Sequence, residues 1–423
     1  MTGLPVPLGL RGCERPSGWI ATRGTRKLGC VRDKAVAPGV NREMTTTFRL
    51  RVTKEQIDVL RARLLATRWP SYDSRDDWSL GTSSDDAKRL AQYWATQFDF
   101  DSLQQRLAAL PHECVVIDDA AVHLVHVRSP RPQAVPVIIT HGWPSSFLEI
   151  VPLIERMTQP ERFGGRAEDA CHLVIPSLPG FGFSSPARTL EGYTGAAIAD
   201  LWARVMTSLG YERFFASGGD IGARVTSWLG ARHPQRVRGI HVSSNALRLV
   251  LPGEAIPTAE EQAYLAQRNQ WATEEGGYMH LQHTKPLSLA YGLSDSPAGL
   301  AAWLAEKWSS WSDGLNCACT EVMDIILSHA TLYWVSNTIA TSFLPYFVYD
   351  WPPGARVDGA QVKVPVGFYL SAAEIGGVPP ESFARRQFEI ARWSVLPRGG
   401  HFMATEEPEL LGDDLLAFIR PFR

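Results

Sequence analysis

The chain has 423 residues, of which 45% are hydrophobic and 20% charged, and its formal net charge is −2 at pH 7. These values are typical of a soluble globular protein with a large core, and the near-neutral charge excludes the broad basic field of a nucleic-acid-binding protein. No uninterrupted apolar run is long enough for a transmembrane helix, so we expect no membrane anchor and a cytoplasmic location.

Residues 1–43 differ from the rest of the chain. Gly, Pro and Arg are scattered through them without helical or strand periodicity, and the apolar run is too short and broken for a signal peptide. We interpret this segment as a leader, disordered or not native, upstream of the domain proper, with Met44 as a candidate start. An Arg-rich transit peptide is a less supported alternative.

The regular pattern begins after this leader. Thr53 stands at a helix N-cap position with Gln56 at the capping-box position, and apolar residues recur behind them at helical spacing. A second amphipathic helix is expected over residues 85–98. Two β-rich runs about Asp118 and Asp119 then predict a hairpin.

The centre of the chain alternates strands and helices. Strands are expected at 135–140 and in the segments CHLVIP, RFFAS and VRGIHV, with a helix over 196–209. This alternation predicts an α/β fold with a mostly parallel sheet. Residues 250–350 are Trp- and Leu-rich and helical in pattern, whereas 351–423 return to strands and a closing helix. We therefore expect one core, formed by 131–249 and 351–423, interrupted by a helical lid.

The sharpest local signal is the turn SGGDIGARV between a predicted strand and a predicted helix. Asp220 has glycines at −1, −2 and +2, which is the spacing of a nucleophile elbow, where glycines permit a strained turn and a close strand–helix approach. An esterase would have Ser at this position. An Asp that only caps a helix is the plain alternative, so the assignment depends on partner residues.

Those partners follow in the order that this fold requires, nucleophile, acid, histidine. His401 lies in PRGGHF, after a predicted strand and before the last helix, where the fold delivers its base. Glu374 follows the late strand PVGFYLS, while the other usual position for the acid, VSSNA, holds no carboxylate. Asp350 is the nearest competitor but lies too early for that strand.

The loop THGWPSS after the strand at 135–140 is where backbone N–H groups form an oxyanion hole. We expect the amides of Trp143 and Ile221 to be the two donors. His141 in the same loop could be mistaken for a catalytic base, but holding the loop is its favoured role.

With these residues assembled, the chain resembles the microsomal-type epoxide hydrolases and their bacterial relatives, from about Thr45 to the C-terminus. The resemblance is carried by ATRWP, THGWPSSFLEI, PSLPGFGFSS, GGDIGARV, GGYMH, LYWVSNTIATSF and PRGGHFMATEEPELL. It implies an epoxide hydrolase N-terminal domain over residues 44–130 ahead of the core. It also implies Asp220 as nucleophile, Glu374 as charge-relay acid and His401 as base.

The resemblance further implies two lid tyrosines that donate to the epoxide oxygen. Tyr278 in GGYMH matches one and Tyr346 in SFLPYF the other, with Tyr349 as the alternative for the second; either could instead be lid packing. Two departures are that many relatives have Trp where this chain has Ile221, and that the lid segment SDGLNCACTEVMDIILSHA differs from the usual pattern. Both leave the shape of the substrate open.

The implied reaction opens an apolar, aryl or bulky epoxide to a vicinal diol through an ester on Asp220, in detoxification or natural-product synthesis. Epoxide and water are the expected partners, with no metal, no organic cofactor and no nucleic acid, and a homodimer is left open. The six cysteines show no CxxC pair, although Cys317 and Cys319 leave a metal or redox pair open.

A haloalkane or haloacetate dehalogenase with the same Asp nucleophile is the nearest rival, and a non-catalytic hydrolase-fold binding protein is the second. A Ser esterase is disfavoured because no GxSxG elbow is present at the expected place.

Overall fold

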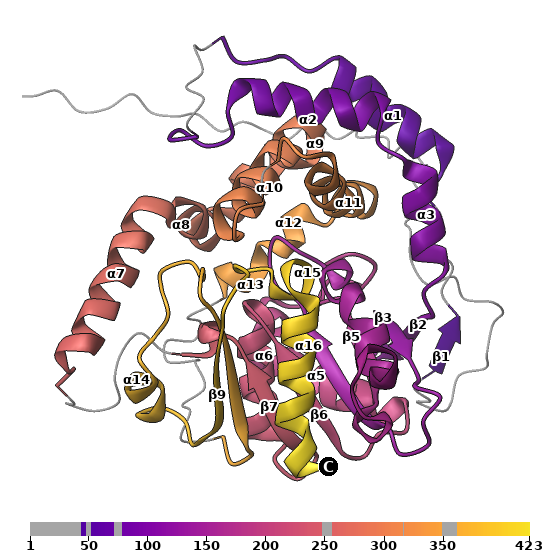
Figure 1. Ribbon diagram of the computed structural model, residues 1–423. Helices are drawn as coiled ribbons and strands as arrows, with labels where there is room; N and C mark the ends of the chain where they lie inside the picture. The colour runs from indigo at the N-terminus through magenta and orange to yellow at the C-terminus, as the bar shows by residue number, and fades with distance from the viewer. Residues whose placement is uncertain (1–43, 48–51, 72–77, 248–255, 316, 349–361) are drawn as a thin grey trace, which may run out of the picture.

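A single mixed sheet forms the centre of the protein (Figure 1). The computed structural model describes residues 44–47, 52–71, 78–247, 256–315, 317–348 and 362–423. The leader at 1–43 lies outside the described residues, as do Tyr349 and Asp350.

Among the described residues the sheet has nine strands in the order β1-β2-β3-β5-β4-β6-β7-β8-β9. Their bounds are β1 (Met44–Thr47), β2 (His112–Ile117), β3 (Ala120–Val127), β4 (Val135–Thr140), β5 (Cys171–Pro176), β6 (Phe214–Gly218), β7 (Val237–Val242), β8 (Val366–Ser371) and β9 (Ile390–Leu396). The pairs β1–β2, β2–β3 and β3–β5 are antiparallel, and every pair from β5 to β9 is parallel. The predicted α/β class with a mostly parallel sheet is confirmed.

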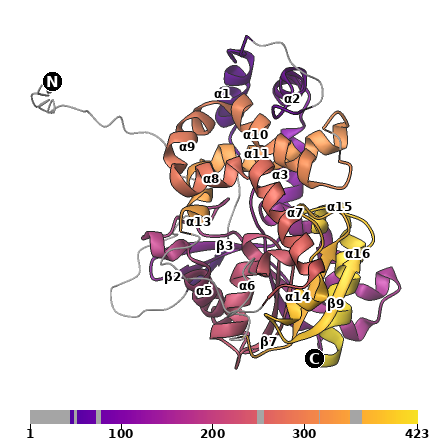
Figure 2. The ribbon, with the colours of Figure 1, turned by 90° about the vertical axis from the view of Figure 1, so that its left-hand side faces the viewer.

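Helices cover both faces of the parallel strands. The core helices are α4 (Ile154–Thr158), α5 (Gly195–Ser208), α6 (Ile221–Arg232), α14 (Glu381–Arg385), α15 (Met403–Glu406) and α16 (Pro408–Ile419). Helices α5 and α6 pack together on one face, and α16 lies on the other (Figure 2). Helix α16 also packs against α4. Because β6 and β8 are buried along their whole length, they are uniformly apolar or small rather than alternating.

Short 3-10 helices lie between these elements, and the last one follows α16. They are η1 (Phe147–Leu153), η2 (Pro160–Phe163), η3 (Ala167–Asp169), η4 (Leu190–Tyr193), η5 (Ser244–Ala246) and η7 (Arg420–Phe422). Of these, η1 follows the loop after β4 and packs against α15, so it bears on the site described below.

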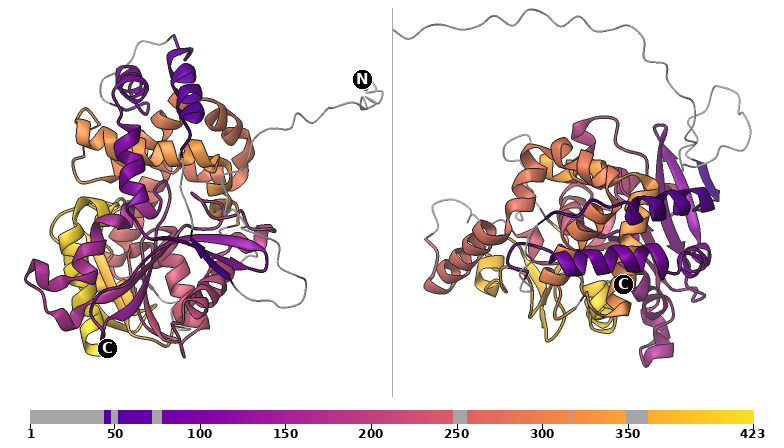
Figure 3. Two further views of the ribbon diagram at one scale, coloured as in Figure 1. Left: turned by 90° about the vertical axis from the view of Figure 1, so that its right-hand side faces the viewer. Right: turned by 90° about the horizontal axis from the view of Figure 1, so that it is seen from above.

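The N-terminal region adds α1 (Lys54–Leu65), α2 (Ser84–Thr96) and α3 (Phe100–Ala108) to the antiparallel strands β1–β3. The predicted capping box is confirmed, because Thr53 and Gln56 bond each other's backbone N–H groups at the start of α1. The predicted hairpin is confirmed too, with Asp118 and Asp119 both at positive φ in the turn between β2 and β3. Thus this region extends the central sheet and also lays two helices over the lid (Figure 3).

The lid is entirely helical within the described residues. It consists of α7 (Ala259–Glu275), α8 (Gly277–Thr284), α9 (Pro286–Asp295), α10 (Pro297–Trp311), α11 (Thr320–Ser336), α12 (Ile339–Ser342) and α13 (Leu344–Phe347). Helix α2 packs on α10, and the indole N–H of Trp94 on α2 donates to the hydroxyl of Thr331 on α11 at 3.0 Å. The lid is therefore held between the N-terminal helices and the sheet (Figure 1). None of the helices described has the length and apolarity needed to cross a membrane.

Candidate active site

The elbow between β6 and α6 holds Asp220 in a strained conformation. Its φ is 51° and its ψ is −122°, a region that non-glycine residues rarely adopt and that costs on the order of 1–3 kcal/mol. A Cβ on Gly222 would lie 2.0 Å from the carbonyl oxygen of Thr140, and a Cβ on Gly218 would lie 2.6 Å from the backbone of Gly222. The glycines of the motif are thus required by the close approach of β4, β6 and α6.

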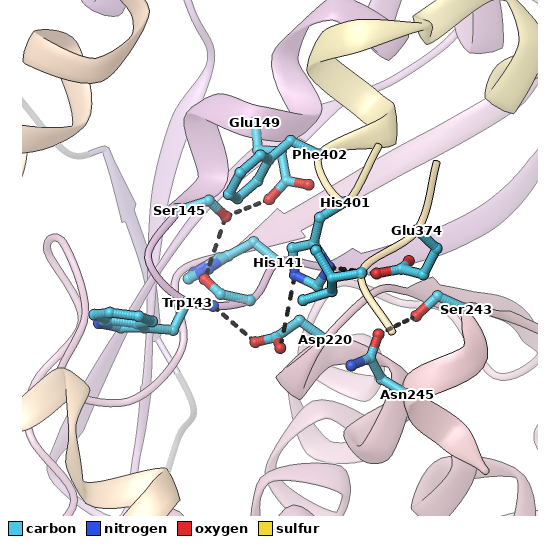
Figure 4. Close-up of polar contacts among 12 residues, drawn as sticks. His141, Trp143, Ser145, Glu149, Asp220, Ser243, Asn245, Glu374, His401 and Phe402 are labelled. Carbon is cyan, nitrogen blue, oxygen red and sulfur yellow. Dashed lines mark hydrogen bonds and ion pairs between the residues drawn. The ribbon is translucent and has the colours of Figure 1, made fainter. Parts of the chain in front are cut away.

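The loop after β4 brings a backbone donor to this carboxylate. The N–H of Trp143 donates to Asp220 Oδ1 at 2.9 Å (Figure 4). A Cβ on Gly142 would lie 2.4 Å from the Cβ of Asp220, so only glycine lets the loop come this close. Ile221 is the first residue of α6, where backbone N–H groups have no intrahelical acceptor. One of the two expected oxyanion donors therefore already binds the carboxylate.

His401 connects Asp220 to the predicted acid. It lies on the loop between β9 and α15, and its Nδ1 is 3.0 Å from Glu374 Oε1 in the turn after β8. Its Nε2 is 3.8 Å from Asp220 Oδ2, and both side chains are almost fully buried (Figure 4). The three residues thus stand in the order carboxylate, imidazole, carboxylate around one point at the carboxyl ends of the parallel strands.

The charges around His401 change its protonation. Burial opposes the imidazolium, but the carboxylates of Glu374, Asp220 and Glu149 outweigh it and raise the pKa of His401 to about 9. The imidazolium is therefore favoured while Asp220 is an anion. Loss of the charge on Asp220 would remove part of this effect and bring the base form nearer to neutral pH.

Two contacts fix the loop that carries His401. The backbone N–H of His401 donates to the carbonyl of Trp311, the last residue of α10, over a distance of 2.7 Å. The carboxylate of Glu406 accepts from the N–H groups of Asp313, Gly400 and Phe402, at 2.7, 2.9 and 2.9 Å. Both contacts hold the histidine loop to the lid.

The two predicted tyrosines are buried next to the oxyanion loop. The ring of Tyr278 on α8 stacks on Trp143 at 5.4 Å and 7°, and Tyr346 on α13 meets the same indole edge-on at 5.8 Å. Burial and the charge of Asp220 raise the pKa of both phenols, so they are protonated donors at neutral pH. The hydroxyl of Tyr346 makes no hydrogen bond of normal geometry within the described part of the chain.

Two further side chains next to the tyrosines were not singled out by the sequence. Trp311 packs against Tyr278 at 5.0 Å and against His401 at 5.2 Å, and the ammonium of the buried Lys307 lies 4.7 Å from the centre of the Tyr278 ring. The run AEKWSSW and the high count of tryptophans were the available signals. Neither states which indole faces the site.

A third residue that the sequence did not single out is Glu149 on η1. Its carboxylate accepts from the hydroxyl of Ser145, and burial raises its pKa to about 7, an effect that the Ser145 hydrogen bond and the charge of His401 oppose (Figure 4). It lines one cavity with Asp220 and His401. The signal was a lone carboxylate in the apolar segment SSFLEI, which a helix-capping role explains equally well.

His141 holds the loop, as expected for it. Its Nδ1 is 3.0 Å from the carbonyl of Gly142, and its Nε2 is 3.2 Å from the N–H of Leu178. Burial lowers the pKa of His141 to about 4, so the ring is neutral and has no free nitrogen for catalysis.

The two neighbouring cysteines of the lid are free thiols, one buried (Cys317) and one exposed (Cys319). Across the described ranges, no group of three or more His, Cys, Asp or Glu is arranged to hold a metal ion.

Two family descriptions match overlapping parts of the chain. "Epoxide hydrolase N terminus" matches residues 45–150, and "alpha/beta hydrolase fold" matches residues 135–275. A protein of Stigmatella aurantiaca that is named as a candidate epoxide hydrolase is 37% identical over 384 residues, which are 89% of this chain and 85% of that protein.

Two solved structures are similar along most of the chain. The juvenile hormone epoxide hydrolase of the silkworm Bombyx mori superposes with a TM-score of 0.79 and 27% identity, covering 90% of this chain and 95% of that one. The epoxide hydrolase of Aspergillus niger gives a TM-score of 0.79 and 27% identity, covering 90% and 97%. The similarity thus includes both the core and the lid.

Proposed function

The chain belongs to the epoxide hydrolases of the α/β-hydrolase fold, and we propose that it opens its epoxide through a covalent ester on Asp220. The observation that carries this proposal is the position of the Asp220 carboxylate. One oxygen accepts the N–H of Trp143, and the other faces the Nε2 of His401. A carboxylate needs no base to attack, so the histidine is left for a second step.

In the first step Asp220 Oδ2 attacks an epoxide carbon and the carbon–oxygen bond of the ring breaks. The ring oxygen takes a proton from the phenol of Tyr278 or Tyr346, which leaves a hydroxyalkyl ester and a phenolate. The positive charge of Arg224, which lowers the pKa of both phenols, favours that negative charge. Buried phenols suit this role because they stay protonated until the oxygen develops charge.

In the second step His401 Nε2, oriented by Glu374, takes a proton from water. The hydroxide attacks Cγ of Asp220, and the tetrahedral oxyanion is stabilised by the N–H groups of Trp143 and Ile221. Collapse breaks the ester bond and returns the Asp220 carboxylate. One proton of the water completes the diol, and the other passes from the imidazolium back to the phenolate, so the cycle closes without a cofactor.

The wall of the site supports an apolar substrate. The indole of Trp143 contacts the rings of both tyrosines. Its ring centroid also lies 6.2 Å from that of Trp311 and 6.1 Å from that of Phe343. Aromatic side chains of this kind favour an aryl or bulky alkyl group by burial of apolar area. We propose such an epoxide as the substrate class.

Dehalogenation by the same nucleophile has one observation in its favour. The indole N–H groups of Trp143 and Trp311 are buried and have no hydrogen-bond partner within the described residues, and such donors can stabilise a departing halide. The two phenols have no corresponding role in that reaction, so the epoxide is the better substrate.

The test compares styrene oxide with a haloalkane of similar size. We expect diol formation from the epoxide and little or no halide release. Halide release without diol formation would replace this proposal by the dehalogenase, and absence of both together with no mass increase on Asp220 would indicate a binding protein.

A further inference from the structure

A small cavity lies beside Asp220 on the side away from the lid. Its volume is about 20 Å³, and its walls come from the loop after β4, η1, the ends of β6 and β8, the histidine loop and α15–α16, with no residue of the lid helices. A volume of this size accommodates about one water molecule. The lid tyrosines do not line it, so it is separate from the place where the epoxide oxygen is protonated.

Polar side chains line much of this cavity. Asp220 and His401 line one part of it, and Ser145 and Glu149 line another, whereas Leu153, Leu411 and Leu415 close it with apolar groups. At 3.8 Å from Asp220 Oδ2, the Nε2 of His401 is beyond normal hydrogen-bond distance, so it is available to a water between the two residues.

A water in this position needs acceptors for both of its hydrogens. His401 Nε2 can take one of them, and a hydrogen left unpaired among apolar groups costs on the order of 1–3 kcal/mol. The leucine side chains cannot accept it, and the hydroxyls of Thr140 and Ser217 in the lining are already bonded to Trp202 and His241. The Glu149 carboxylate can, and the hydroxyl of Ser145 holds that carboxylate in place while also contacting the carbonyl of Gly142 at 3.2 Å.

We propose that Glu149 and Ser145 seat the hydrolytic water of the second step in this cavity, with Glu149 accepting the hydrogen that His401 does not take. The inference rests on the ester at Asp220 proposed above. Glu149 acts on the water and on the field at His401, so it is a positioning residue. It does not form or break a bond with the substrate.

A purely structural role fits Glu149 less well than it fits Glu406. The carboxylate of Glu406 accepts three backbone N–H groups and fixes two loops. That of Glu149 accepts a side-chain hydroxyl and lines the cavity with the nucleophile and the base. Burial raises the pKa of Glu149 to about 7, so this carboxyl group changes charge near neutral pH.

The experiment separates the two steps in Glu149→Gln and Ser145→Ala. Rapid quenching with styrene oxide, followed by mass spectrometry of the Asp220 peptide, gives the rates of ester formation and ester hydrolysis. Glu155→Gln is the matched control, because this neighbouring glutamate on α4 is exposed and pairs with the exposed Arg162.

We expect Glu149→Gln to slow ester hydrolysis about 10- to 100-fold and to leave ester formation unchanged. In steady state kcat and KM then fall together while kcat/KM is kept, and Ser145→Ala shows the same pattern to a smaller degree. The pH limb of hydrolysis moves to lower pH in Glu149→Gln, because one of the charges that favour the imidazolium of His401 is gone.

Two results would overturn the inference. One is a hydrolysis rate in Glu149→Gln and Ser145→Ala equal to that of Glu155→Gln. The other is a fall in ester formation as large as the fall in hydrolysis, with no shift of the pH limb, which would mark general damage to the site. If Glu149→Gln does not fold, the rates of Ser145→Ala alone decide. Absence of any ester in the wild-type protein would instead refute the proposed function.

Discussion

Two buried histidine–carboxylate pairs lie at the parallel strands, and they differ in what the second ring nitrogen meets. In the pair His401–Glu374, Nδ1 meets the carboxylate and Nε2 faces the cavity beside Asp220. In the pair His241–Asp414, Nε2 is 2.8 Å from the carboxylate and Nδ1 is 3.4 Å from the hydroxyl of Ser217. The second ring therefore has both nitrogens engaged.

The carboxylates differ in the same way. Asp414 also accepts hydrogen bonds from the guanidinium of Arg392 and the hydroxyl of Ser394. Burial alone would raise the pKa of Asp414, but its contacts with His241, Arg392 and Ser394 hold that pKa well below the usual range. Glu374 lies in a turn after β8 and meets His401. A buried histidine paired with a carboxylate is thus not by itself a base. What makes a base is the free nitrogen beside a reactive group.

The largest effect expected from breaking this comparison is in His401→Gln. Ester formation on Asp220 continues, because a carboxylate attacks without a base, but turnover falls about 10⁴-fold or more and the ester accumulates. Mass spectrometry of the protein after incubation with styrene oxide measures the adduct. In His241→Gln the folded fraction should instead keep wild-type turnover, and equal loss in both variants would contradict the distinction.

The lid donors should give the next largest effect. Tyr278→Phe and Tyr346→Phe each remove a proton donor to the epoxide oxygen, and we expect ester formation to slow by about 10²–10⁴-fold in the double variant and less in each single one. Single-turnover rates of ester formation test this. If hydrolysis of an already formed ester slowed to the same degree, the phenols would not have the role assigned to them.

The His241–Asp414 pair is expected to contribute to the free energy of unfolding rather than to turnover. Asp414→Asn leaves Arg392 and His241 without their carboxylate, and we expect a loss of about 3–5 kcal/mol in the free energy of unfolding with kcat of the folded enzyme unchanged. Urea unfolding at neutral pH measures it.

The pH dependence of this loss has a defined sign. The folded-state pKa of Asp414 is depressed, so its contribution is complete above the carboxyl's unfolded pKa of about 4 and is lost as the pH falls. The free energies of unfolding of the wild-type protein and of Asp414→Asn should therefore converge as the pH falls. A constant difference down to low pH would show that the lost contacts do not depend on the charge of Asp414.

The smallest effect expected is a difference in pH dependence between the two steps. Hydrolysis needs neutral His401, so its rate falls as the pH drops below the pKa of that ring, by about tenfold per unit. The midpoint should lie below 9, the value raised by Glu374, Asp220 and Glu149, because the ester removes the charge of Asp220. Ester formation should not follow this limb. Stopped-flow rates of both steps across pH test the prediction, and a shared limb would contradict it.

Local spacing predicted the elbow and the capping box, because both are built from residues close together in the chain. The positions around Asp220 require glycine, because a side chain there would clash where α6 approaches β4. Thr53 and Gln56 lie within one helical turn, so their spacing alone predicts the capping box. His401 followed from chain order. Tyr278 and Tyr346 came from the family resemblance, since nothing in their own spacing points to the nucleophile.

Other features depend on contacts between distant segments and could not be predicted. The joining of β3 to β5 brings the N-terminal strands into the central sheet, and no local pattern specifies that register. Helix α3 was not expected either, because its nine residues are too few to show a clear helical repeat of apolar positions. Glu149 and Trp311 acquire their place only when η1 and α10 meet the histidine loop.

The central claim is that Asp220 carries a covalent ester, and a single turnover in oxygen-18 water tests it most directly. With enzyme in excess over styrene oxide, the hydroxide derived from water attacks Cγ of Asp220, so the label should enter the Asp220 carboxylate and be absent from the diol. Mass spectrometry of the Asp220 peptide and of the diol reads both positions. Label in the diol with an unlabelled Asp220 would show that water attacks the epoxide directly and would contradict the account.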